Sequence, residues 1–202
     1  SPEVEQANMH LGYQLVNAAK ESNGRDFIGN INWEQALSTN LYLGGYTLDP
    51  RRFADFILLL KSGNAVDGTG RKVPESKLAE ILDEITKVRS LYRAEWLDAD
   101  FKYLNGKLWL YSDHRLSNTS LDANCKKELE SCLMSKGSRI DFSTINNQGM
   151  PTQEGNDFQY WCPDKDNKSV ARFDADSDRA GLFCGRDPTD TYPSLGVRLA
   201  LP

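Results

Sequence analysis

The apolar residues of the first half of the chain recur at the spacing of one face of a helix. The stretch between Asp49 and Gly63 shows this most clearly, because its apolar residues follow the i, i+3, i+4, i+7 pattern: Phe53, Phe56, Ile57 and Leu60. Asp49 is a good N-cap, Pro50 suits the first helical position, and Gly63 suits the end. The pattern predicts a helix between Asp49 and Gly63.

Three further segments are expected to be helical. Residues 3–22 place one apolar set on a single face: Leu11, Leu15, Val16 and Ala19. A short helix is expected after the N-cap Asn32, with Glu34 and Gln35 in its first turn. A longer helix from about Pro74 has a buried stripe of Leu78, Ile81, Leu82, Ile85 and Val88. The glycine-rich residues 63–73 are predicted to form a surface loop.

After Trp96 the pattern changes to that of strands. Two β-prone runs flank Asn105-Gly106, a strong signal for a hairpin turn. A short helix is expected around residues 126–134, and short strands and loops from Arg139 onwards. No repeat or low-complexity linker divides the sequence. We therefore expect one α+β domain over residues 1–202, with helices early and a small antiparallel sheet late.

Composition narrows the class of partner. The chain is 39% hydrophobic and 26% charged with a formal net charge of −5, as in an ordinary soluble globular protein. No basic stretch indicates nucleic-acid binding, and no apolar run approaches the ~20 residues that span a bilayer. The first ten residues lack a signal-peptide pattern. We expect neither a nucleic-acid partner nor membrane insertion, and the compartment stays open.

The four cysteines give no metal-binding spacing. There is no C-x-x-C, and His10 and His114 lie far from every cysteine in the sequence. The four cysteines are Cys125, Cys132, Cys162 and Cys184. Free thiols are slightly favoured over two disulfides, for which three pairings are possible.

The stretch "RFDADSDRAGLFCG", residues 172–185, has aspartates at alternate positions, as at the start of a calcium loop. Counted from Asp174, however, the sixth position is Arg179 and the twelfth is Gly185, where such a loop needs glycine and a bidentate glutamate. No metal site is therefore expected.

Alternation in a strand instead predicts which side chains share a face. The outward set is expected to be Asp174, Asp176, Asp178, then Gly181, Phe183, Gly185 and Asp187. The inward set is expected to be Ala175, Ser177, then Ala180, Leu182 and Cys184.

The final segment also has an unusual composition. Lys, Glu, Gln, Met and Trp make up about a fifth of residues 1–168 but are absent from residues 169–202. These five residue types are the ones that cannot be encoded when the adenines of an AAC or AAT codon are freely replaced. A shortage of helix formers in a β-rich segment would explain most of the deficit, but not the missing Trp.

These residues carry a family resemblance. The segment "SVARFDADSDRAGLFCGRDPTDTYPSLGVRLA" resembles the C-terminal variable region of the target proteins of diversity-generating retroelements, most closely the archaeal group. Upstream, "LGGYTLDPRRFADFILLLKSGNAVDGTG", "YRAEWLDADF" and "LESCLM" are similar to the same group. The resemblance implies a C-type lectin-like fold in which residues 169–198 form a ligand-binding region that hypermutation varies.

Carried over residue by residue, the resemblance divides this region into two sets. The scaffold positions would be Ser169, Val170, Ala171, Arg172, Phe173, Ser177, Ala180, Leu182, Cys184, Pro188, Leu195, Gly196, Val197 and Arg198. The variable, ligand-binding positions would be Asp174, Asp176, Asp178, Arg179, Gly181, Phe183, Gly185, Asp187, Asp190, Thr191, Tyr192 and Pro193. Tyr160 and Trp161 are candidates for flanking contacts.

The resemblance implies binding without catalysis or cofactor, to an unknown ligand that we expect to be a protein or another macromolecular surface. The acidic outward set favours a partner with basic or hydrogen-bond-donating groups, with Phe183 and Tyr192 as apolar anchors. Two alternatives stay open on the same fold. One is a carbohydrate-binding lectin that works without calcium, and the other is an enzyme like the formylglycine-generating enzymes, whose reactive pair would be Cys125 and Cys132.

Overall fold

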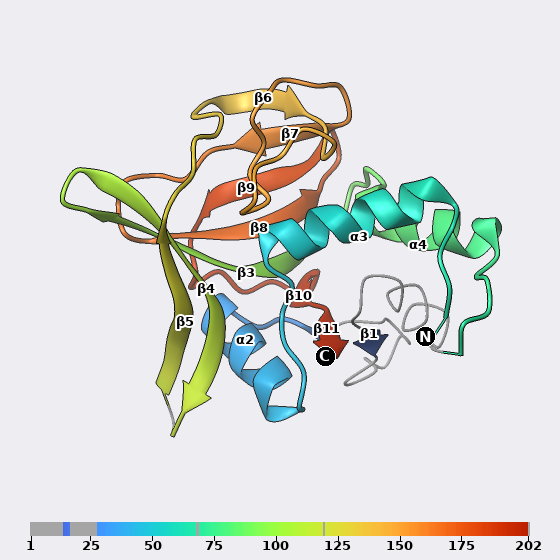
Figure 1. The fold of residues 1–202 in the computed structure, drawn as a ribbon, viewed down its shortest axis with the longest axis horizontal. Helices are drawn as coiled ribbons and strands as arrows, with labels where there is room; N and C mark the ends of the chain where they lie inside the picture. The colour runs from blue at the N-terminus through green and yellow to red at the C-terminus, as the bar shows by residue number, and fades with distance from the viewer. Residues whose placement is uncertain (1–13, 17–27, 68, 119, 202) are drawn as a thin grey trace.

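The computed structural model describes residues 14–16, 28–67, 69–118 and 120–201. This part of the chain is a mixed α+β fold (Figure 1). The helices are α2 (Trp33–Tyr42), α3 (Pro50–Ser62) and α4 (Glu75–Thr86). The strands are β1 (Gln14–Val16), β2 (Ile28–Gly29), β3 (Arg93–Leu104), β4 (Lys107–Ser117), β5 (Ser120–Glu128), β6 (Lys136–Ile140), β7 (Phe158–Trp161), β8 (Ser169–Ala175), β9 (Ala180–Arg186), β10 (Leu195–Val197) and β11 (Leu199–Leu201).

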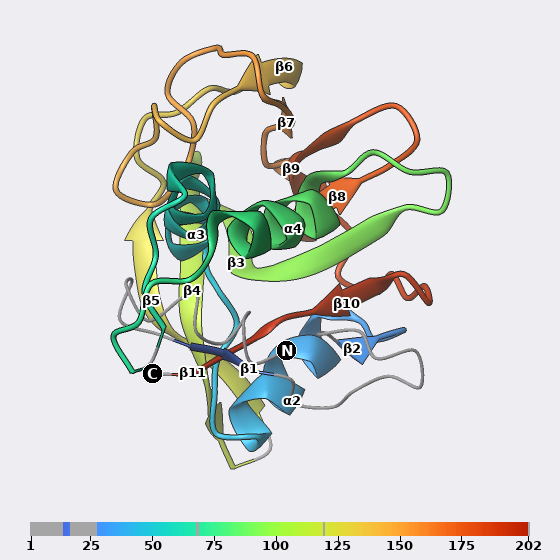
Figure 2. The same cartoon turned by 90° about the vertical axis from the view of Figure 1, so that its right-hand side faces the viewer.

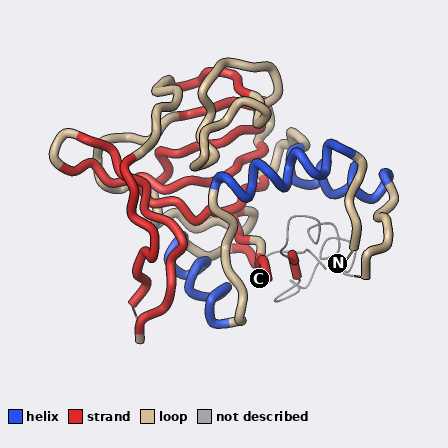
Figure 3. Tube along the Cα trace, in the orientation of Figure 1, coloured by secondary structure: helices blue, strands red, loops and turns tan. Residues whose placement is uncertain are grey.

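Nine of the described strands form one mixed sheet in the order β2-β10-β3-β8-β9-β7-β6, with β4 and β5 branching from β3. β10 runs parallel to β3 and β7 runs parallel to β9, while the other pairs are antiparallel. The expectation of a small antiparallel sheet was therefore wrong in extent and in direction. Both parallel pairs join strands that are not consecutive in the sequence, and local alternation carries no information about such pairing. Figure 3 shows β4 and β5 leaving the rest of the sheet as a two-stranded ribbon.

The predicted helix ends are confirmed where capping residues occur. Asp49 accepts a hydrogen bond from the backbone N–H of Arg52 at 2.8 Å, and α3 ends at Gly63, which has a φ of 66°. The Asn32 side chain accepts from the Gln35 backbone at 2.9 Å, and the Gln35 side chain accepts from the Asn32 backbone at 3.0 Å. This reciprocal capping box fixes the start of α2.

α4 differs from its prediction at one position. Leu78, Ile81 and Ile85 are buried as expected, and Leu82 is half-buried. Val88 lies beyond the last turn and is 43% exposed, so it does not belong to the buried stripe. The loop before α4 is also less exposed than predicted, because Ala65 is fully buried.

The predicted hairpin turn is confirmed, since Asn105 and Gly106 connect β3 to β4 with φ values of 52° and 79°. The helix expected at residues 126–134 does not form. β5 continues to Glu128, which pairs with Trp109 of β4, and the remaining residues are irregular. The long partner strand β4 offers backbone hydrogen bonds that outweigh the helix propensity of a Lys- and Glu-rich segment.

The N-terminal helix prediction is wrong for its one described part, residues 14–16. These residues form β1, which pairs antiparallel with β11 in a separate two-stranded sheet. Residues 3–13 and 17–22 of that prediction lie outside the described residues.

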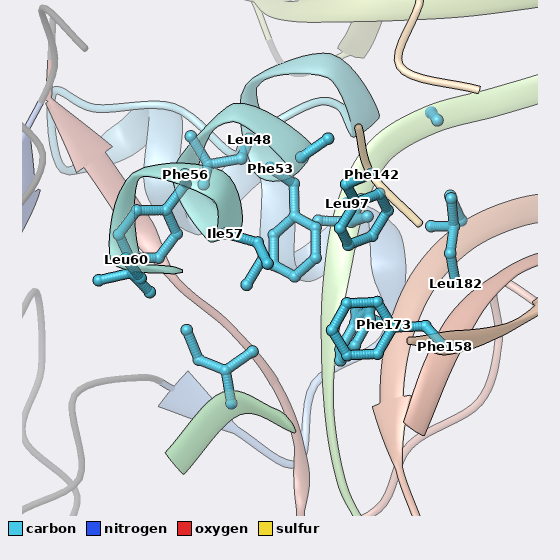
Figure 4. Close-up of a cluster of buried hydrophobic side chains, with 14 of the residues drawn as sticks. Leu48, Phe53, Phe56, Ile57, Leu60, Leu97, Phe142, Phe158, Phe173 and Leu182 are labelled. Atoms are coloured by element: carbon cyan, nitrogen blue, oxygen red, sulfur yellow. The ribbon is translucent and has the colours of Figure 1, made fainter. Parts of the chain in front are cut away.

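The main core lies between the sheet and the two helices α3 and α4, which lie side by side in Figures 1 and 2. Aromatic rings fill its centre (Figure 4): the Phe53 and Phe173 centroids are 5.1 Å apart, and those of Phe158 and Phe173 are 5.3 Å apart. Phe173 and Leu182 therefore project from β8 and β9 toward α3. The side chains between them along each strand lie on the opposite face, away from the main core.

A buried ion triad crosses from β3 to the end of β10. Arg198 donates to both carboxylate oxygens of Glu95 at 3.2 Å, and Arg93 Nη1 donates to Glu95 Oε2 at 2.7 Å. Burial raises the pKa of Glu95, but Arg198 and Arg93 outweigh it and hold the pKa at about 2. The triad therefore holds the residue between β10 and β11, Arg198, against β3.

A second cluster joins α2 to the sheet through Trp33 and Trp96. Trp33 Nε1 donates to the carbonyl of Leu97 at 2.9 Å, and Trp96 Nε1 donates to the carbonyl of Ile31 at 2.9 Å. Among the described residues, no helix has both the length and the apolar character needed to cross a bilayer.

Candidate ligand-binding surface

Most of the predicted scaffold positions in residues 169–198 are buried. Ser177 is exposed and Ala180 and Pro188 are half-buried, whereas the others have little contact with solvent. The buried ones are Ser169, Val170, Ala171, Arg172, Phe173, Leu182, Cys184, Leu195, Gly196, Val197 and Arg198. Leu182 and Cys184 join the main core, as the alternation predicted.

The three alternate aspartates do not share one strand face. β8 ends at Ala175, and the backbone N–H of Asp176 donates to the carbonyl of Arg179 at 2.7 Å to close a turn. Asp174 is buried, Asp176 is half-buried and Asp178 is exposed. The prediction for Ser177 was wrong for the same reason, since the turn directs it to solvent.

Asp174 is the centre of an ion network rather than an exposed acid. It is 4% exposed, and Nε of Arg172 lies 2.8 and 3.1 Å from its two carboxylate oxygens. Arg186 Nη2 donates to Asp174 Oδ2 at 2.8 Å, and Arg172 Nη1 donates to Asp190 Oδ2 at 3.3 Å. Two guanidinium groups therefore neutralise Asp174.

A row of aromatic and cationic side chains crosses the same face of the sheet. Consecutive register partners on β3, β8, β9, β7 and β6 are Trp96, Arg172, Phe183, Trp161 and Lys136. Register partners on adjacent strands share a face. Arg172 lies 5.6 Å from the centroid of the Trp96 ring, and Lys136 lies 5.9 Å from that of Trp161. The row supplies flat rings on which cations stack.

Phe183 belongs to this row but is not the exposed anchor that the sequence predicted. It is 3% exposed because the guanidinium groups of Arg186 and Arg179 lie 4.4 and 5.4 Å from its ring centroid. Tyr192 does reach solvent, at 45% exposure, and packs edge-on against Tyr92 with centroids 5.8 Å apart.

A pocket of about 310 Å³ opens beside this row. Its lining is Lys136, Trp161, Asp164, Arg179, Phe183, Gly185 and Arg186. Lys136 Nζ lies 2.6 Å from Asp164 Oδ1, and this hydrogen bond raises the pKa of Lys136. The half-buried Trp161 thus lies beside the variable segment. Tyr160 does not, because it is fully buried and donates its hydroxyl to the carbonyl of Leu133 at 3.0 Å.

Two glycines among the predicted variable positions differ in the room around them. A Cβ added at Gly181 would lie 2.4 Å from the backbone oxygen of Gln159, on the adjacent strand. A Cβ at Gly185 would lie 2.7 Å from Asp164 Oδ2, which is the end of a movable side chain. A side chain fits at position 185 but not at position 181 without a backbone shift.

The remaining predicted positions lie on the turn after β8 and on the connection from β9 to β10. Asp187, Thr191 and Pro193 are exposed, and Asp190 is half-buried. Asp187 accepts hydrogen bonds from the Thr189 backbone at 2.9 Å and from its hydroxyl at 2.7 Å, which lowers the pKa of Asp187.

Two residues of the pocket lining were not predicted from the sequence: Lys136 and Asp164. Arg186 follows directly after a predicted variable position and links the pocket to Asp174. Lys136 and Asp164 come from other parts of the chain and carry no local signal. Their place depends on the pairing of β6, β7 and β9.

All four cysteines lie in the described part of the chain and are free, as preferred from the sequence. Burial raises the pKa of the Cys132, Cys162 and Cys184 thiols. Cys125 and Cys132 line two different depressions, so they do not form a pair. The described residues contain no group of three or more His, Cys, Asp or Glu side chains arranged to hold a metal ion.

Comparisons with family models, with curated proteins and with solved structures found no match to this chain.

Proposed function

We propose that this chain is a ligand-binding protein with a C-type lectin-like fold, and that residues 169–198 form a binding surface diversified by a retroelement. The proposal starts from the resemblance of this segment to the variable regions of such target proteins, and from its lack of Lys, Glu, Gln, Met and Trp.

The observation that carries the proposal is that predicted variable positions from separate segments meet on one connected surface. Asp174 and Asp190 meet at Arg172, while Arg179, Phe183 and Gly185 meet at the pocket. Arg186 joins the two groups, because it pairs with Asp174 and stacks on Phe183.

The surface suits recognition by a preformed scaffold. Strands β8 and β9 are anchored in the main core by Phe173 and Leu182, so exposed side chains on the opposite face can change without moving the backbone. Substitutions on that face then change the shape and charge of the surface while the fold remains, as in an antibody paratope.

We propose binding rather than catalysis, without a cofactor, and a protein or another macromolecular surface as the partner. The charged groups of the surface are held in place by ion pairs or by stacking on rings, which supports a role in recognition. The exposed Thr191, Tyr192 and Pro193 extend the surface beyond the pocket, and an exposed tyrosine is typical of protein interfaces.

The decisive experiment is deep sequencing of the 3′ end of the gene across many cells of the source population, with the codons of α3 as an internal control. We expect substitutions concentrated at the predicted variable codons other than 181, where a Cβ would meet backbone, and at template adenines, and a uniform α3. A 3′ end as uniform as the α3 codons would refute diversification.

A further inference from the structure

We propose that the pocket lined by Arg179, Arg186 and Trp161 binds one carboxylate group, carried by an acidic side chain of a protein partner. This inference rests on the proposed function, since it concerns the ligand of the same surface. It reverses the expectation of a partner with basic or hydrogen-bond-donating groups, which was based on aspartates that are not part of the pocket lining; Asp174, the buried one, is neutralised by two arginines.

One cation of the pocket lining has no close carboxylate partner. Among the cations of the lining, Lys136 is paired with Asp164 at 2.6 Å and Arg186 is paired with Asp174 at 2.8 Å. Arg179 only approaches the exposed Asp178 at 4.0 Å, a contact that solvent weakens. The pocket therefore has an excess of one positive charge, located on Arg179.

The stacking of the two arginines prepares them for an oxygen ligand. Their guanidinium groups lie over the Phe183 ring, at 4.4 Å for Arg186 and 5.4 Å for Arg179. A guanidinium stacked on a ring keeps its N–H groups at the edge, where a planar carboxylate accepts two of them.

Arg186 adds a donor that lacks an acceptor. Its Nη2 donates to Asp174, but its buried Nε has no hydrogen-bond partner among the described residues. An unpaired buried donor is costly, and an anionic oxygen is the acceptor that stabilises it most. Because this Nε is closed to solvent, the Arg186 side chain must shift for a bound carboxylate to accept from it.

A carboxylate fits the charge and size of the pocket better than a phosphate does. Asp164 and Asp174 already lie beside the cations, so a dianion would meet two negative groups, whereas a single negative charge balances Arg179. The volume of about 310 Å³ is at the low end for ligand pockets, and is suited to one side chain.

The pocket combines predicted fixed and variable positions. Lys136, Trp161 and Arg186 lie outside the predicted variable set, whereas Arg179 and Gly185 belong to it. Any side chain at position 185 would meet Asp164 and fill space in the pocket. Carboxylate binding is therefore a property of this variant that positions 179 and 185 control.

The test is an NMR titration of the full chain with N-acetyl-glutamate N-methylamide, which carries one carboxylate. N-acetyl-glutamine N-methylamide is the neutral control, and inorganic phosphate is the second anion. We expect the Trp161 indole N–H and the Gly185 amide to shift with the glutamate probe, to shift much less with phosphate, and to stay unchanged with the glutamine probe.

Variants assign the response to the pocket. Arg179→Gln removes the unmatched charge and should weaken binding of the glutamate probe about tenfold or more, the usual loss for a charge-assisted hydrogen bond. Gly185→Leu should abolish binding by filling the pocket. Arg115→Gln is the matched control, because it removes an exposed arginine of β4 that is not part of the pocket lining, and should leave binding unchanged.

Three results would overturn the inference: no shift with the glutamate probe, equal shifts with the glutamine probe, or tighter binding of phosphate. An unchanged affinity in a folded Arg179→Gln variant would do the same. These results are independent of the sequencing experiment. A diversified 3′ end without carboxylate binding rejects this ligand class alone, and binding with a uniform 3′ end rejects diversification alone.

Discussion

Phe183 provides the sharpest test of how this surface is built. The sequence pattern predicts that its ring reaches solvent, whereas in the structure two arginine side chains cover it. The change is Phe183→Ala, compared with Phe173→Ala in the main core and Tyr192→Ala on the surface. Phe173 packs among other phenylalanine rings, Phe183 is covered by two arginines, and Tyr192 contacts one ring.

The three changes should destabilise the fold to different degrees. Removing the Phe183 ring loses about 2 kcal/mol of apolar burial and about 0.5–1 kcal/mol for each stacked arginine. The flexible arginines close over part of the space, so the net loss should be about 3 kcal/mol. Phe173→Ala leaves a cavity with rigid walls and should cost about 3–5 kcal/mol, whereas Tyr192→Ala should cost less than about 1 kcal/mol.

The assay is urea unfolding followed by tryptophan fluorescence, with stabilities compared at a common m-value. The order of stability loss should be Phe173, then Phe183, then Tyr192. If Phe183→Ala lies within about 0.5 kcal/mol of the unmodified protein, the ring is not held under the arginines and our account of this surface is wrong.

The remaining predictions concern the strands that support the surface. Gly181→Ala should destabilise the fold by about 1–3 kcal/mol, because its Cβ meets backbone, whereas Gly185→Ala should cost less than about 1 kcal/mol; thermal unfolding of the two variants measures the difference, and equal losses would contradict it. Glu95→Gln should cost about 3–5 kcal/mol at neutral pH, because it removes the buried carboxylate that pairs with both Arg93 and Arg198. The pKa of Glu95 is lowered from 4.5 to about 2, so its contribution is complete above pH 4.5 and is lost as the pH falls toward 2. Urea unfolding at a series of pH values should therefore show the gap between Glu95→Gln and the unmodified protein closing over that range, and a constant gap would exclude this origin. Cys184 is fully buried with a raised thiol pKa, so a thiol reagent should modify Cys125 first and Cys184 only on unfolding. Early labelling of Cys184, read by mass spectrometry, would contradict its burial.

The elements predicted correctly are those fixed by contacts close in sequence. The ends of α3 follow from Asp49 and Gly63, and the β3–β4 turn follows from Asn105-Gly106. The segment around Lys126 failed because its structure depends on a distant strand. Its composition favours a helix, but backbone pairing with β4 makes it a strand up to Glu128.

For the site, the alternation of residues along a strand predicted which face of the strand each side chain lies on, but not whether that side chain is buried. Asp174 and Phe183 do point away from the main core, as the period of two predicts, and yet both are buried. What buries them is the position of long arginine side chains from β8, β9 and the intervening turn. A periodic pattern states on which side of a strand a residue lies, and the conformation of neighbouring long side chains decides whether it reaches solvent.

This difference between facing outward and being exposed predicts a pattern of variation. Asp178, Asp187 and Tyr192 contribute little to the fold, so the population should contain many residue types at these positions. Position 181 should remain glycine, because any Cβ there meets the Gln159 backbone, and position 174 should retain a hydrogen-bond acceptor for Arg172 and Arg186.

These losses of folding stability are large enough for selection to act on. Small domains are stable by about 5–15 kcal/mol, and a loss of about 3 kcal/mol at a buried position is a large share of that margin. The sequencing that tests diversification therefore also tests the structure. Equal diversity at positions 174, 178 and 181 would mean that the buried contacts of this surface do not constrain the fold. If diversity instead increases with the exposure of the position, selection for stability removes the substitutions that destabilise the fold.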